Sequence, residues 1–219
     1  MCGRFALTHI AGFWTRFAVI DRQATLGPRF NIAPSQTVPV IVSGSGNRAM
    51  PMRWGLVPFW AKDPKIGDKL INARAETVAI KPAFRTSLKG RRCLVPATGF
   101  YEWRKGKPGK VPYYVRMKDD SLFAFAGLYE RWKGPDGSEL LTFTIITTTP
   151  NAIMERIHDR MPVILDPSEE GRWLAKESLT EDDRAGLLDP YPARGMEAFE
   201  VSTAVNSPAN ESEELIRPI

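Results

Sequence analysis

The chain has 219 residues, of which 43% are hydrophobic and 25% are charged, with a formal net charge of +5 and a pI near 9.3. These values are typical of a globular protein and exclude a disordered or fibrous chain. A domain of this length can bury a sizeable core. The sequence has neither a basic leader followed by an apolar run nor ~18 consecutive apolar residues. We therefore expect neither export nor membrane insertion, and a cytoplasmic location.

Cys2 follows the initiator methionine in the run Met-Cys-Gly-Arg-Phe. Because its side chain is small, we expect Met1 to be removed, which would make Cys2 the amino terminus. Its α-amine (pKa about 7.7) and thiol (about 8.5) would then both be reactive near neutral pH. Such a 1,2-aminothiol condenses with an aldehyde to a Schiff base, and the thiol closes onto the imine carbon to give a thiazolidine. Alternatively, Cys2 is a small apolar residue near a frayed terminus.

The second cysteine, Cys93, lies far from Cys2 in the sequence, and in a reducing compartment both are better interpreted as thiols than as a disulfide. The histidines, His9 and His158, form no close-spaced ligand pair with each other or with the cysteines, so we expect no metal. Phosphate-binding loops, dinucleotide fingerprints and serine-nucleophile motifs are not found in the sequence. No cofactor is expected.

Short apolar segments bounded by proline or glycine predict strands at 38–42, 50–57, 92–95, 101–103, 111–117, 122–128, 140–147 and 162–165. Capping signals predict short helices at 8–17, at 151–157 and after residues 166–169. This pattern predicts an α+β fold, a single domain with a twisted antiparallel β-barrel-like core and short peripheral helices. We expect the core to span residues 2–205 and residues 206–219 to form a polar, loosely held tail.

Basic residues cluster at 85–92 and 104–110. Together with the positive net charge they favour an acidic partner, of which nucleic acid is the obvious candidate. A run of glycine, lysine and proline such as 104–110 is also typical of a solvated hairpin tip. Residues 53–60, preceded by 30–34, combine aromatic residues with arginine, glycine and proline, which is typical of stacking platforms for unpaired bases. The same aromatic residues could equally belong to the core.

Three polar side chains in distinct motifs are candidates for chemistry. Asn72 can hold an amine or a carbonyl group, although it could instead cap a helix. Glu102 lies between aromatic residues, where desolvation would raise its pKa into the range useful for general acid–base catalysis. Strand alternation could instead point Glu102 to solvent. His158 follows a predicted helix in a loop, a position that often serves function, or it is a hydrogen-bonded structural histidine.

Taken together, these segments resemble the SOS-response-associated peptidase (SRAP) family, the abasic-site processing proteins. The resemblance runs nearly end to end, through residues 1–5, 30–34, 54–58, 72–76, 92–96, 99–103, 157–162 and 202–206. It implies one α+β domain with a barrel-like core and a positively charged groove for single-stranded DNA. It also implies that the amino-terminal cysteine captures the open-chain aldehyde of an abasic deoxyribose as a thiazolidine DNA–protein crosslink. The expected location is the cytoplasm, at the nucleoid and replication forks.

The resemblance also implies roles for catalytic residues. Cys2 would supply the amine and the thiol, and Asn72 would orient the amine. Glu102 would shuttle protons as general acid and base, both in imine formation and in reversal of the crosslink. His158 would protonate the ring oxygen and so open the sugar to its aldehyde. A weak abasic-site lyase activity is expected from the Schiff-base stage.

The resemblance further implies DNA contacts. Arg4 and Arg74 are expected to bind phosphates, because a guanidinium pairs with phosphate oxygens. Trp54 and Pro34 are expected next to the flanking bases. Single-stranded DNA containing abasic sites is thus the expected partner, with no membrane contact, and we expect a monomer whose protein partners the sequence does not indicate.

Two other functions fit the same residues. In an amino-terminal-nucleophile hydrolase or peptidase, the Cys2 thiolate attacks an amide and its own amine acts as the base. In a non-enzymatic single-stranded DNA-binding module, Cys2 would be dispensable and no covalent product would form.

Overall fold

The computed structural model describes residues 2–107 and 109–219. The predicted removal of Met1 therefore concerns a residue outside the described range. The strands are β1 (Phe5–Leu7), β2 (Val19–Arg22), β3 (Arg29–Ile32), β4 (Thr37–Ser43), β5 (Asn47–Trp54), β6 (Asn72–Arg74), β7 (Arg92–Ala97), β8 (Gly99–Gly106), β9 (Gly109–Met117), β10 (Phe123–Lys133), β11 (Glu139–Thr148), β12 (Met161–Pro162), β13 (Ile164–Leu165) and β14 (Met196–Glu200). The α-helices are α1 (Phe13–Arg16), α2 (Arg85–Gly90), α3 (Glu170–Leu174) and α4 (Glu181–Leu187). The 3₁₀ helices are η1 (Pro64–Lys69), η2 (Met154–Arg156), η3 (Ala193–Gly195), η4 (Thr203–Asn206) and η5 (Glu213–Ile216).

A closed barrel forms the centre of the molecule. Its strands follow the order β4, β7, β10, β11 and β5, and neighbours along this path pair antiparallel except at the closing seam. There β5 pairs with β11 in parallel, with Arg53 opposite Thr142 and Trp54 opposite Phe143. The α+β fold with a barrel-like core is therefore confirmed. The parallel seam is a detail that the sequence pattern did not predict.

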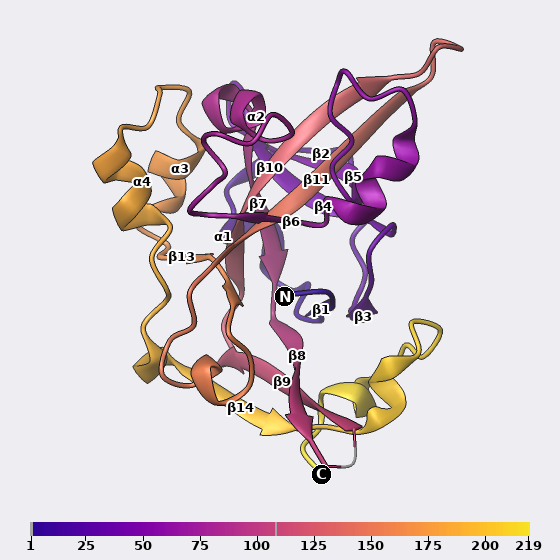
Figure 1. Cartoon of the computed structure of the whole chain (residues 1–219), viewed down its shortest axis with the longest axis vertical. Helices are drawn as coiled ribbons and strands as arrows, with labels where there is room; N and C mark the ends of the chain where they lie inside the picture. The colour runs from indigo at the N-terminus through magenta and orange to yellow at the C-terminus, as the bar shows by residue number, and fades with distance from the viewer. Residues whose placement is uncertain (1, 108) are drawn as a thin grey trace.

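A second, antiparallel sheet continues from the barrel in the order β14, β9, β8, β1 and β3. Only Thr98 separates β7 from β8, so the chain passes directly from the barrel into this sheet. Figure 1 shows the barrel above, the β8–β9 hairpin below, and strand β1 between them.

The amino-terminal strand β1 is fixed by its neighbours and by one aromatic side chain. Phe5 pairs with Ile32 of β3 on one side and with Phe100 of β8 on the other. Its ring packs edge-on against Trp54 and Phe125, at centroid distances of 5.2 and 5.9 Å. Each such pair contributes about 0.5–1.5 kcal/mol beyond the burial of area. The position of the residues just before Phe5 is thereby set by the barrel core.

The carboxyl-terminal residues differ from the loosely held tail that the sequence predicted. Leu215 is only 2% exposed and packs with β1, β8 and β9 in a small second core. The Glu211 carboxylate accepts hydrogen bonds from the backbone of Phe30 and Asn31. The amide of Ile219 donates to Glu200. A single buried leucine and a carboxylate that binds strand β3 hold the segment in place.

The predicted strands all overlap observed ones, but the helices are shorter than expected. Of residues 8–17, only α1 is helical, and of 151–157, only η2. The N-cap of η2 is Ile153, which makes no side-chain cap hydrogen bond, and Asn151 Oδ1 in the turn before it accepts from the amides of Ile153 and Met154. Residues 166–169, whose capping signal predicted the start of a helix, form a turn in which the Ser168 amide donates to Asp166 Oδ1. The helix α3 begins after this turn without a side-chain cap.

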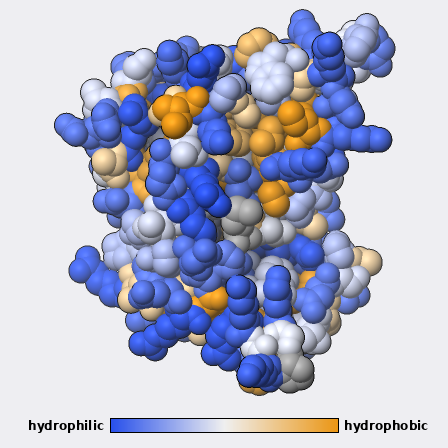
Figure 2. Space-filling model, viewed as in Figure 1, coloured by the Kyte–Doolittle hydropathy of each residue, from blue (hydrophilic) through white to orange (hydrophobic). Residues whose placement is uncertain are grey.

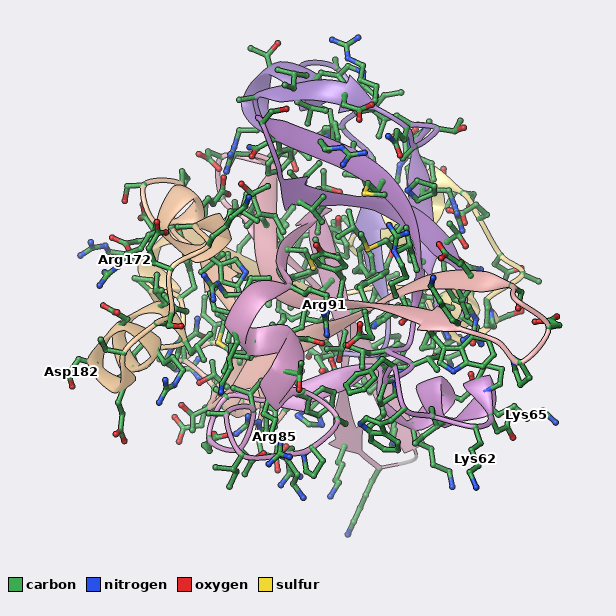
Figure 3. The ribbon with its side chains drawn as sticks, turned by 90° about the horizontal axis from the view of Figure 1, so that it is seen from above. Lys62, Lys65, Arg85, Arg91, Arg172 and Asp182 are labelled. Atoms are coloured by element: carbon green, nitrogen blue, oxygen red, sulfur yellow. The ribbon has the colours of Figure 1, made fainter. Side chains whose placement is uncertain are left out.

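The helices lie at the periphery, and none among the described residues is long and apolar enough to cross a membrane. Seen from above, charged side chains project outward there, with Lys62 just before η1, Lys65 within it, and Arg172 and Asp182 on α3 and α4 (Figure 3). On the face drawn in Figure 2, most groups are hydrophilic and the hydrophobic ones gather over the upper half.

We predict that Gly99→Ala destabilises the protein. A Cβ at Gly99 would overlap the ring of Tyr114 beside strand β1, whereas a Cβ at Gly186 in α4 would meet nothing within 4 Å. Overpacking of this kind costs about 1–3 kcal/mol, which lowers the melting temperature by roughly 2–4 °C per kcal/mol in a chain of this size. The control Gly186→Ala should be neutral or slightly stabilising. Equal melting temperatures for the two variants would contradict this packing.

Candidate active site

Cys2 is buried, three residues before strand β1 begins. It has no exposed surface, and its carbonyl oxygen accepts a 2.7 Å hydrogen bond from Asn72 Nδ2. Asn72 itself begins β6, which pairs with β11 of the barrel through Ile145. Burial raises the pKa of the Cys2 thiol far above its ordinary value, and the nearby Glu102 carboxylate raises it further. The thiol is therefore held in its protonated form.

Asn72 has a side-chain oxygen that is buried without a hydrogen-bond donor among the described residues. Its Nδ2 is used by Cys2, but its Oδ1 is buried and accepts no hydrogen bond from the part of the chain that the structure describes. A buried acceptor without a donor costs about 1–3 kcal/mol, so such atoms in folded proteins call for an explanation. Asn72 thus fixes residue 2 with its amide nitrogen and offers a carbonyl oxygen to a further donor.

Glu102 is buried on β8, with only 2% of its surface exposed. The alternative that strand alternation turns it to solvent is therefore excluded. Burial raises the pKa of its carboxyl group, while the positive charge of nearby groups, His158 among them, acts in the opposite direction. The environment favours the protonated acid, as desolvation of a carboxyl group requires.

His158 lies just after η2, and its backbone amide donates to Met154 at 2.7 Å. Its Nδ1 is 3.0 Å from the amide of Arg160 and 2.9 Å from Asp159 Oδ1. The amide contact requires a lone pair on Nδ1 and the carboxylate contact requires a proton there. Asp159 is 88% exposed, so its attraction is screened by solvent. In the tautomer in which Nδ1 accepts from the Arg160 amide, the proton of the ring lies on Nε2.

Glu102 and His158 line one cavity of about 340 Å³, together with Trp103, Lys110 and Asn206. This cavity continues into a groove of about 800 Å³ between the β8–β9 hairpin and the loop that holds η2. Four basic side chains line the groove: Arg104, Lys105, Lys110 and Arg156. The basic run 104–110 is thus the tip of a hairpin, as one alternative had it, and it also faces the cavity.

Arg74 lies at the end of β6, two residues after Asn72. It is exposed and lines a cavity of about 510 Å³ with Trp60, Asn72 and Lys81. The side chains of Phe59 and Trp60 are 55% and 49% exposed, which is unusual for large aromatic residues in this chain. The sequence pattern at 53–60 predicts stacking aromatic residues but does not distinguish the buried Trp54 from the exposed Phe59 and Trp60. It therefore does not identify Phe59 and Trp60 as the candidates for base stacking.

The structure bears on three of the predicted DNA contacts, those of Trp54, Arg4 and Pro34. Trp54 has no exposed surface, its ring stacks on Phe143, and its Nε1 donates to Ile71, so the predicted base contact is wrong. Arg4 is half-buried and donates to Asn31 Oδ1 at 2.8 Å and to the Val205 carbonyl at 2.9 Å, which gives it a structural role. Its phosphate contact stays a prediction, as does the base contact of the half-buried Pro34.

This geometry defines a class, namely a β-barrel protein whose second residue is a buried cysteine beside an asparagine, a carboxyl group and a histidine-lined cavity. The family model described as SOS response associated peptidase (SRAP) matches residues 1–208, and the chain belongs to this family. The resemblance seen in the sequence is thereby confirmed.

Individual relatives agree with this assignment. The chain is 51% identical over 221 residues to the abasic site processing protein YoqW of Bacillus subtilis, covering 99% of both proteins. It is 34% identical to the abasic site processing protein HMCES of Xenopus tropicalis, covering 88% of this chain and 66% of that protein. A crystal structure of a protein from Bacteroides thetaiotaomicron matches over 100% of both chains with a TM-score of 0.90 and 31% identity.

We predict that Glu102→Gln stabilises the protein at neutral pH. The pKa of Glu102 is raised in the folded state, so ionisation of the carboxyl group costs stability above the pKa of the unfolded chain. A neutral glutamine does not bear this cost. The melting temperature of the variant should exceed that of the wild type at neutral pH, and the difference should shrink as the pH falls toward the ordinary range of glutamate. The exposed Glu155→Gln serves as the control, and a lower melting temperature for Glu102→Gln at neutral pH would refute the prediction.

Proposed function

We propose that this protein processes abasic sites in single-stranded DNA by forming a covalent thiazolidine crosslink through Cys2, after removal of Met1. The observation that carries the proposal is the burial of Cys2 next to Asn72 and Glu102. Support comes from the relatives, which are named abasic site processing proteins. An abasic deoxyribose supplies the aldehyde that a 1,2-aminothiol captures.

The first step opens the sugar. His158, with its proton on Nε2, lines the cavity and donates that proton to the ring oxygen. The C1′ hydroxyl gives its proton to a solvent water as the ring bond to oxygen breaks, and C1′ becomes the carbonyl carbon of an aldehyde. A histidine suits this role because its ring gives up and regains a proton near neutral pH.

The second step joins the amine to the aldehyde. Once Met1 has been removed, the freed amine of Cys2 donates a hydrogen bond to Asn72 Oδ1, the buried acceptor that accepts none from the described residues as they stand. The amine attacks C1′ to give a carbinolamine. Glu102, whose pKa is raised by burial, protonates the hydroxyl group, which leaves as water and yields the protonated Schiff base and the Glu102 carboxylate.

The third step makes the adduct stable. The Cys2 sulfur adds to the carbon of the protonated Schiff base, whose nitrogen keeps its hydrogen, and this closes the thiazolidine ring. Because burial raises the pKa of the thiol, its proton needs an acceptor, and the Glu102 carboxylate left by the second step takes it and becomes the acid again. The sum of the steps releases one water. Reversal follows the same steps backward. β-Elimination from the Schiff base gives the weak lyase activity.

The DNA strand would lie across both cavities. Arg74 and Lys81 offer phosphate contacts in the cavity beside Asn72, and Arg104, Lys105 and Arg156 offer them in the groove beside His158. Basic side chains along a groove attract the phosphate backbone in a salt-dependent manner. The exposed rings of residues 59–60 are suited to stack on unpaired bases.

A peptidase that uses the Cys2 thiolate is less well supported. Such a nucleophile needs a lowered thiol pKa, whereas burial raises that of Cys2. The crosslinking scheme instead begins with the amine and uses the thiol last, on an electrophilic imine carbon. The two functions also differ in their products, since only crosslinking retains DNA on the protein.

We predict a covalent adduct with a single-stranded oligonucleotide that carries one abasic site. Intact-mass spectrometry without reductant should show protein lacking Met1 plus DNA minus one water. Cys2→Ala should abolish the stable adduct, because it keeps the α-amine but removes the thiol that closes the ring. Cys93→Ala should retain it, since Cys93 is buried in the barrel wall. An equal yield of stable adduct from Cys2→Ala would disprove the proposal.

We predict that Arg74→Met weakens binding of damaged and undamaged single strands alike. The loss of one phosphate contact should lower the slope of log affinity against log salt by about 0.7. Fluorescence anisotropy with labelled oligonucleotides over a salt series measures both quantities. Arg131→Met, on the exposed β10–β11 hairpin, is the control of equal charge change. A salt slope unchanged by Arg74→Met would remove Arg74 from the DNA contacts.

A further inference from the structure

The motif at residues 202–206 has no part in the chemistry above, although it ends in the cavity that holds Glu102 and His158. The motif forms the 3₁₀ helix η4 and is held rigidly. Ser202 Oγ accepts from the amide of Ala204, and Val205 is fully buried. The Val205 carbonyl accepts from Arg4 and Asn31. The next residue, Asn206, is thus presented from a fixed backbone.

The side-chain amide of Asn206 has a defined orientation. Its Oδ1 accepts a 2.8 Å hydrogen bond from Trp103 Nε1. An indole nitrogen is only a donor, so the oxygen of the amide must face Trp103 and the NH₂ group must point elsewhere. Within residues 2–107 and 109–219, the Asn206 Nδ2 donates to no protein acceptor. The cavity wall therefore carries an oriented amide donor.

A second donor lines the same cavity. Lys110 on β9 is exposed and forms no ion pair with any residue that the structure describes. An ammonium group and an amide NH₂ on one wall are suited to bind the oxygens of an anion. The anion attached to every abasic sugar is its phosphodiester. The two donors lie beside Glu102 and His158, which act on that sugar in the proposed reaction.

We propose that Asn206 Nδ2 and Lys110 Nζ bind the phosphodiester adjacent to the abasic sugar. This inference rests on the proposed function and assigns Asn206 as a positioning residue, held in orientation by Trp103. The phosphate contact places the sugar between His158 and Cys2 without touching the reacting carbon. The subsite raises affinity for the strand and leaves the intrinsic chemistry of Cys2 unchanged.

The test uses two substitutions that differ in chemistry. Asn206→Asp keeps an oxygen for Trp103 but replaces the donor by a negative charge, and Lys110→Met removes the ammonium at an exposed position where folding is not at risk. Binding is measured by anisotropy with a single strand that contains a tetrahydrofuran residue, an abasic analogue without an aldehyde. We expect Asn206→Asp to weaken binding by roughly tenfold or more, as for loss of a hydrogen bond to a charged group. Lys110→Met should lower the salt slope by about 0.7, and Lys110→Arg should retain it.

A second measurement separates positioning from damage to the site. Free 2-deoxyribose has the aldehyde but no phosphate, so its rate of adduct formation with Cys2 should be equal in wild type, Asn206→Asp and Lys110→Met. In crosslinking of abasic DNA, the half-saturating DNA concentration should rise while the maximal rate constant changes by less than about threefold. Unchanged binding of the tetrahydrofuran strand by both variants would overturn the inference. So would a rate of adduct formation that falls by the same factor with abasic DNA and with free 2-deoxyribose. Because the strand-binding assay needs no covalent step, failure of crosslinking in the wild type would count against the proposed function and not against the phosphate subsite.

Discussion

The structure depends on the way strand β1 is fixed, because this strand carries the residue at which the chemistry is proposed. Phe5 extends into the aromatic core of the barrel, against Trp54 and Phe125. The backbone of β1 pairs with β3 and β8 on its two edges. A chain end fixed in this way does not fray, unlike most termini. Cys2, three residues earlier, is therefore buried and bonded to Asn72 instead of being mobile in solvent.

Burial of the site has a cost and a chemical effect. A desolvated carboxyl group at Glu102 and an acceptor without a donor at Asn72 both lower the free energy of unfolding. The same burial raises the pKa of both the Cys2 thiol and the Glu102 carboxyl group, which favours their protonated forms. An amine-first reaction needs an acid to expel water and a thiol that reacts only once an imine exists. Features that weaken the fold locally thus match the order of steps in the proposed function.

Much of the fold could be predicted from the sequence, since each predicted strand alternates or runs apolar between glycine and proline residues. The helices were overestimated because the sequence shows capping residues but not that the helix ends after one turn, as at η2. Trp54 and Trp60 lie in one motif, and only the closure of the barrel at the β5–β11 seam decides that the first is buried and the second exposed.

The site could be predicted in its residue types but not in its geometry. Asn72, Glu102 and His158 come from three separate segments, and their assembly around Cys2 depends on how β6, β8 and the η2 loop pack against the barrel. The carboxyl-terminal segment was mistaken for a loose tail because one leucine in a polar run carries little signal. Asn206 belonged to a motif that the sequence marked, but its role depends on a contact with Trp103 that no spacing reveals.

The central claim is that one carbon of the abasic sugar is bonded to both the nitrogen and the sulfur of Cys2. Tandem mass spectrometry of the nuclease-digested adduct, after treatment with a thiol-alkylating reagent, tests this most directly. The account predicts a sugar-phosphate remnant on the amino-terminal Cys2 with no alkyl group on its sulfur. A remnant on a lysine, or a remnant on Cys2 whose sulfur is alkylated, would contradict it.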